Sequence, residues 1–154
     1  MFNPDGALVS TYVPSFETAA RSLKVVPIVA PVHDDVEIET AIAALGREPG
    51  GGLVVMPDVF MHRAPLILGA ARNNVPAVYT MSEFVRDGGL LSYGPDLVDN
   101  WRRAASYVDR ILRGEKPGDL PVQFPVKYET VLNLKPPRRW ALPCHCRFGF
   151  APTR

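Results

Sequence analysis

A short polar and aromatic segment, Ser92-Tyr93-Gly94-Pro95-Asp96, stands where a predicted strand ends and a long predicted helix begins. In open parallel sheets, ligands bind outside the carboxyl ends of the strands. Aromatic rings offer a ligand contact area at small entropic cost, and carboxylates can orient an amine. The candidate ligand contacts at predicted strand ends are Asp58, Phe60, Tyr79, Tyr93 and Asp96. This set could hold an amino acid or a similar small polar and aromatic solute.

The same residues also have a purely structural interpretation, in which Asp58 and Asp96 cap helices and the tyrosines pack in the core. Evidence for catalysis is weaker still. His33 and His62 lie far apart, and no GxSxG turn presents a nucleophile to either of them. His33, between an apolar residue and an aspartate, is expected on a surface loop.

Two other motifs give no chemistry. The turn Pro49-Gly50-Gly51-Gly52 lacks the Lys-Ser/Thr pair of a phosphate-binding loop and precedes a predicted strand instead of a helix. Cys144, His145 and Cys146 are adjacent and therefore lack the spacing of a structural zinc site. The sequence thus predicts no catalytic residue, no metal and no cofactor.

Composition excludes several classes of function. A length of 154 residues fits one domain with room for a core. A net charge of +1 gives no electrostatic reason to expect nucleic acid or an anionic membrane as a partner. No apolar run approaches the roughly 18 residues of a membrane span. The opening Met1-Phe2-Asn3-Pro4 is not typical of an export signal, so the chain as given is expected to stay in the cytoplasm.

Apolar runs alternate with helical patterns along the chain, which predicts βαβ units and a mostly parallel sheet. Strands are expected at residues 25–30, 53–56, 75–79, 90–93 and 127–134, with Phe2 at the end of a further strand. Helices are expected at residues 15–23, 61–72 and 82–85, and from Leu97 to the residue before Gly114. A further helix is expected to be capped by Asp34 or Asp35 and to end at Gly46. The segment Val25–Ala30 is apolar and β-branched, as a strand buried on both faces should be. The predicted fold class is α/β, a Rossmann-like three-layer lobe.

The helix after Pro95 has the clearest pattern. Its apolar residues recur at helical spacing and form one stripe: Leu97, Trp101, Ala104, Ala105, Val108, Ile111 and Leu112. Charged residues occupy the opposite face, and Gly114 ends the helix.

Two stretches carry a resemblance to a known family. GREPGGGLVVMPD and VPAVYTMSEFVRDGGLLSYGPDLVDNW, with the residues up to Lys135, resemble bacterial ABC-transporter substrate-binding proteins of the tryptophan/tyrosine-type group. The resemblance implies a type I periplasmic binding protein fold, in which two Rossmann-like lobes close on a solute. It also implies export from the cytoplasm and two protein partners, a membrane permease and its ATPase.

The resemblance divides the chain into three parts. Residues 1–80 are similar to the second lobe, with its start missing, and residues 81–135 to the crossover, long helix and final strand toward the first lobe. The resemblance assigns Tyr93 and Asp96 to the crossover side of the ligand site, and Asp58, Phe60 and Tyr79 to the second lobe. Because most of the first lobe is absent, the fold is expected to be incomplete, and the long helix should expose its apolar stripe.

The last part, residues 136–154, differs in character, with both cysteines and four arginines but no acidic residue. Restoring one nucleotide after the Lys135 codon permits the reading Thr-Ala-Lys-Ala-Leu-Gly, with which the family continues. The hypothesis is a one-base deletion that leaves an aberrant, poorly ordered tail. The nucleotide sequence tests it, because without a one-base shift that restores an open frame the hypothesis fails.

Two other functions fit the same fold. One is a cytosolic effector-binding sensor module, which would need an attached DNA-binding or signalling segment. The other is a small flavodoxin-like enzyme, which would need a phosphate-binding loop where Asn3-Pro4-Asp5-Gly6 offers only a turn. The favoured prediction is the solute-binding component of an ABC-type uptake system, which binds a small molecule and does not convert it.

Overall fold

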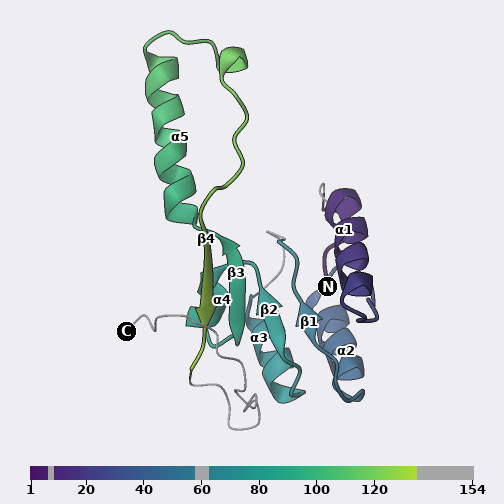
Figure 1. Cartoon of the computed structure of the whole chain (residues 1–154). Helices are drawn as coiled ribbons and strands as arrows, with labels where there is room; N and C mark the ends of the chain where they lie inside the picture. The colour runs from purple at the N-terminus through teal and green to yellow at the C-terminus, as the bar shows by residue number, and fades with distance from the viewer. Residues whose placement is uncertain (7–8, 58–62, 135–154) are drawn as a thin grey trace.

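The computed structural model describes residues 1–6, 9–57 and 63–134 (Figure 1). Asp58, Phe60, His62 and the predicted aberrant tail therefore lie outside the described residues. The strands are β1 (Leu53–Val54), β2 (Ala77–Tyr79), β3 (Leu91–Pro95) and β4 (Tyr128–Leu132). The helices are α1 (Val9–Ser22), α2 (Asp35–Leu45), α3 (Arg63–Arg72), α4 (Ser82–Arg86), α5 (Leu97–Leu112) and the short 3₁₀ turn η1 (Pro117–Asp119). No helix among these combines the length and apolar content that a membrane crossing requires.

The four strands form one sheet in the order β1-β2-β3-β4. β1, β2 and β3 run parallel, and β4 pairs antiparallel with β3. The register places Tyr79 beside Ser92, and Tyr93 opposite Thr130. Helices connect the parallel strands, as a parallel sheet requires. The α/β class with a mostly parallel sheet is therefore confirmed.

An isolated β-bridge lies beside β1. The amino group of Met1 donates to the Val54 carbonyl at 2.8 Å. On the other side, the Phe2 amide donates to the Ala30 carbonyl at 3.2 Å, and the Val32 amide donates to the Phe2 carbonyl at 3.0 Å. Phe2 thus forms an isolated parallel bridge with Pro31, before α2, while Met1 contacts β1. The predicted strand end at Phe2 is present only as this bridge.

The prediction of a strand at Val25–Ala30, buried on both faces, is wrong. The structure has no strand over these residues, and the side chains of Val26 and Ile28 are 82% and 72% exposed. In the described residues this segment meets a neighbouring strand only at its end, where Ala30 accepts from Phe2. Without a partner alongside, an apolar and β-branched sequence cannot form the ladder that its composition favours.

Capping residues position α2. The Asp34 side chain accepts a hydrogen bond from the Glu37 amide at 2.8 Å, and Gly46 follows the last helical residue. Both ends agree with the prediction from the sequence. His33 lies on the surface, as predicted, and its ring lies 3.0 Å from a Glu37 carboxylate oxygen. This hydrogen bond is the main cause that raises the pKa of His33 above 6.5.

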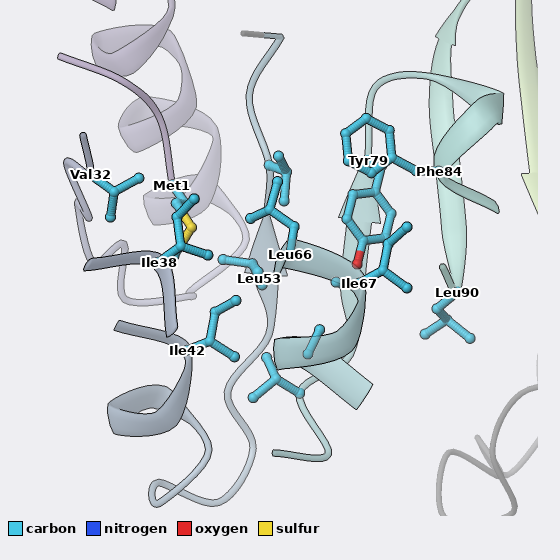
Figure 2. Packing of buried hydrophobic residues seen from close by; sticks show 14 residues of the cluster. Met1, Val32, Ile38, Ile42, Leu53, Leu66, Ile67, Tyr79, Phe84 and Leu90 are labelled. Atoms are coloured by element: carbon cyan, nitrogen blue, oxygen red, sulfur yellow. The ribbon is translucent and has the colours of Figure 1, made fainter. Parts of the chain in front are cut away.

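The core lies around β1 and β2, where α2, α3 and α4 contribute apolar side chains (Figure 2). Ile42 of α2 and Leu66 of α3 are fully buried, and Leu53 of β1 lies close to them. Tyr79 and Phe84 continue the cluster toward α4. This packing holds α4 next to the end of β2, and residues of α4 line the candidate site described below.

The helix α5 and the segment that returns from it project away from the sheet (Figure 1). No residue of α5 is buried, and Trp101 and Leu112 are 74% and 81% exposed. The returning segment exposes Phe124 as well, and it is tied to the helix where the Tyr107 hydroxyl donates to the Pro121 carbonyl at 2.6 Å. The predicted exposure of the apolar stripe is confirmed.

Candidate functional site

The carboxyl ends of the parallel strands meet at one edge of the sheet, the edge from which α5 departs (Figure 1). Four connecting segments follow these strand ends: 3–6 after Phe2, 55–57 after β1, 80–81 after β2, and Asp96 after β3. In a sheet of this kind, ligands bind outside these ends. The edge is therefore the place to compare with the predicted contacts.

Tyr79 lies in the core. Its side chain has no exposed surface, and its ring stacks on Phe84 with 4.7 Å between centroids (Figure 2). The alternation of β2 places Ala77 and Tyr79 on the same buried face. Burial raises the pKa of the Tyr79 hydroxyl to about 12, and that hydroxyl has no hydrogen-bond partner among the described residues. The ring is therefore positioned for packing and does not reach the open edge.

Tyr93 lies on the other face of the sheet. Tyr79 is in register with Ser92, and adjacent residues of a strand point to opposite faces. Tyr93 is 57% exposed and stacks on Tyr128 of β4 with 5.7 Å between centroids. The structure therefore does not bring Tyr79 and Tyr93 together. The pair of Tyr93 and Tyr128 is an exposed aromatic surface close to the strand ends.

Asp96 is held by two contacts at the start of α5. Its carboxylate accepts from the Asp99 amide at 3.0 Å, which makes it the N-cap of the helix. It also pairs with the Lys127 ammonium at 2.6 Å. The hydrogen bond with Lys127 is the main cause that lowers the pKa of Asp96 and raises the pKa of Lys127. Asp96 therefore carries a charge that a neighbour already balances.

A pocket of about 110 Å³ opens beside Asp96. It lies between the first residues of α4, the end of β3 and the start of β4. Its walls are Met81–Glu83, Arg86, Pro95–Val98 and Glu129. The mixture of apolar and charged side chains at a strand end suits a small polar molecule with an apolar part. Of the predicted contacts in the described residues, the pocket includes Asp96.

Two polar residues at the start of α4 line this pocket. Ser82 is 9% exposed. One carboxylate oxygen of Glu83, Oε2, is buried and lacks a partner within the described part of the chain. Sequence reasoning missed Glu83, because a glutamate in the first turn of a helix is typical of a solvated position. The sequence feature that could have indicated Glu83 is its position, four residues after Tyr79 and therefore close to the carboxyl end of β2.

The residues described contain no arrangement for metal binding. No group of three or more His, Cys, Asp or Glu side chains is close enough there to hold a metal ion. The residues that line the pocket can recognise a molecule by hydrogen bonds and charge. Asp58 and Phe60 lie outside the described residues.

Solved structures share this fold. A conserved domain protein from Vibrio cholerae matches with a TM-score of 0.74 and 21% identity, over 85% of this chain and 45% of that one. An ABC domain from Streptococcus pneumoniae, described as a complex with L-Trp, matches with a TM-score of 0.72 and 18% identity, over 85% of this chain and 46% of that one. The chain thus spans less than half the length of either structure.

The comparison with curated proteins gives no match. A family model does match, over residues 1–140, and its description is ABC transporter substrate binding protein. The match includes both stretches that carry the resemblance in the sequence, and it includes the strand ends and the pocket. With nearly the whole chain matched, the protein belongs to the ABC transporter substrate binding protein family.

Proposed function

We propose that the protein binds a small-molecule solute at the carboxyl edge of its parallel sheet and takes part in an ABC-type uptake system. The observation that carries the proposal is the pocket beside Asp96, at the strand ends of a member of a substrate-binding family. Ligands of open parallel sheets bind at such ends. In this role the protein binds the solute and releases it unchanged.

The ligand is proposed to be an amino acid or a related amine, with an aromatic amino acid as the first candidate. One structure of the same fold is described as a complex with L-Trp, which supports this choice. The exposed Tyr93 and Tyr128 rings, stacked near the same edge, could extend the contact surface for an aromatic solute. Asp58 and Phe60, proposed to follow β1 at this edge, would contribute from the second lobe.

The remaining parts of the proposal follow from the family. Residues 1–80 are proposed to form the second lobe and residues 81–135 the crossover toward a first lobe, with residues 136–154 outside the fold. A permease and its ATPase are the proposed protein partners, and the working location is outside the cytoplasm. The apolar surface of α5 would then face the first lobe, which is consistent with its exposure in the described residues.

Thermal unfolding in the presence of solutes tests this function. A ligand that binds only the folded protein stabilises it by RT ln(1 + [L]/Kd), about 2.7 kcal/mol at 100 Kd. We expect one or more of the standard L-amino acids to raise the Tm in a concentration-dependent way. Mass spectrometry of the recovered solute should show no change. Absence of any shift across amino acids, amines and aromatic acids, or conversion of a solute, would refute the proposal.

A further inference from the structure

Glu83 presents a buried carboxylate oxygen that no described donor satisfies. Most buried polar atoms in proteins have a hydrogen-bond partner, and an ionised oxygen without one is costly. Glu83 also lines the pocket at the end of β2. An unsatisfied acceptor next to an open cavity is the arrangement expected where a ligand supplies the missing donor.

Ser82, beside it in the chain, lines the same pocket. This residue is about nine-tenths buried, and its hydroxyl can accept or donate a hydrogen bond. A pocket of about 110 Å³ is far larger than the roughly 15 Å³ that one water molecule needs. It therefore has room for a polar group together with several carbon atoms.

The charges around the pocket favour a cation. Three carboxylates line it, on Glu83, Asp96 and Glu129, against the single guanidinium of Arg86. Lys127 balances Asp96. Arg86 is exposed and makes no ion pair with a described residue. Glu83 and Glu129 therefore have no ion-pair partner among the described residues, and even with Arg86 counted the pocket keeps a net negative charge, which would repel a carboxylate ligand.

We propose that Glu83 and Ser82 form the binding subsite for a primary ammonium group of the solute. The ammonium donates to Glu83 Oε2 and to the Ser82 hydroxyl, while the adjoining carbon atoms lie against Met81, Pro95 and Leu97. This inference rests on the proposed solute-binding function and makes it more specific. The subsite requires an amine on the ligand for binding, and no contact in it is assigned to a carboxylate of the ligand.

Three related probes distinguish the contribution of the amine to binding from that of the carboxylate. L-tryptophan has an amine and a carboxylate, tryptamine has only the amine, and indole-3-propionate has only the carboxylate. Binding of each to the full chain is measured by calorimetry at neutral pH. Tryptophan and tryptamine should bind, and Glu83→Gln should weaken both by at least about tenfold, because a charge-assisted hydrogen bond is replaced by a neutral one. Glu39→Gln, the same change on the exposed face of α2, should leave both affinities unchanged.

Unfolding without ligand distinguishes recognition from a structural role. If Glu83 serves the ligand, Glu83→Gln keeps or raises the Tm of the free protein, because it removes a carboxylate whose buried Oε2 has no partner among the described residues. A lower Tm with unchanged probe affinity would assign Glu83 to folding and overturn the inference. Binding of indole-3-propionate as tight as that of tryptamine, or an unaffected Glu83→Gln variant, would also overturn it and leave solute binding intact. Failure of all three probes and of every other amine would overturn both proposals.

Discussion

Removal of the Tyr79 hydroxyl is expected to stabilise the protein. The hydroxyl is buried and has no partner among the described residues, while the ring stacks on Phe84 at an interplanar angle of 14°. A buried hydroxyl without a hydrogen bond costs about 1–3 kcal/mol in mutational data. Tyr79→Phe removes this cost and keeps the ring contact. The free energy of unfolding should therefore rise by about 1 kcal/mol or more.

The same substitution should change the response to alkali. Burial raises the pKa of Tyr79 from 10.0 to about 12. The folded state thus holds this proton more tightly than the unfolded state does. Ionisation of Tyr79 therefore costs the folded state nothing below about pH 10, and the free energy of unfolding falls as the pH rises from 10 toward 12. The shift in pKa corresponds to a total loss of about 3 kcal/mol. Tyr79→Phe should lack this part of the alkaline loss.

Urea and thermal unfolding followed by circular dichroism measure both effects, at neutral pH and near pH 11. For a domain of this size, 1 kcal/mol corresponds to a rise in Tm of about 2–4 °C. Tyr128→Phe is the matched control, because its residue is 51% exposed and its hydroxyl can reach water. That variant should change the Tm little.

A clear outcome would refute this reasoning. A fall in Tm for Tyr79→Phe would mean that the hydroxyl has a partner that stabilises the fold. An unchanged Tm with weaker binding of the solute would instead place Tyr79 in contact with the ligand, as the sequence predicted, and would contradict the packing role.

Three further predictions concern the end of β3 and the helix after it. Asp96→Asn keeps an acceptor for the helix N-cap but loses the charge pair with Lys127, and Asp96→Ala loses both, so the Tm should fall in the order wild type, Asn, Ala. Because the pKa of Asp96 lies below its ordinary 3.8, its stabilising contribution should be present above about pH 4 and be lost as the pH falls through the lowered pKa, with no such loss in Asp96→Ala. Gly94→Ala should unfold the protein or destabilise it by at least about 3 kcal/mol in urea, since an added Cβ would overlap the Thr80 carbonyl oxygen; a soluble variant with unchanged Tm would contradict this. Trp101, which is 74% exposed, should be oxidised rapidly in hydroxyl-radical footprinting of the free chain, and protection would show that its surface is covered.

Much of the fold could be predicted because local signals agree with it. Asp34 and Gly46 mark the ends of α2, and Asp96 marks the start of α5. The strong apolar stripe of α5 was also evident from spacing alone, and its exposure followed from the resemblance. In these segments capping and periodicity act within a few residues, so the sequence contains the information directly.

The errors and omissions have a different origin. Val25–Ala30 has the composition of a buried strand, but a strand also needs a neighbour along its length, and the described residues supply one only at Ala30. Tyr79 is the last residue of β2, yet the pleat directs its ring into the core. Glu83 was missed because burial of one oxygen depends on how α4 packs on β2 and β3, which no local pattern records.

Amide chemical-shift mapping during titration with L-tryptophan tests the central claim most directly. The claim is that a solute binds at the carboxyl edge of the parallel strands, in the pocket between α4, the end of β3 and β4. We expect saturable shifts concentrated at Met81, Glu83, Leu97 and Glu129, with the spectrum of the solute itself unchanged over time. Shifts centred on residues far from this edge, or signals of a converted solute, would contradict the account.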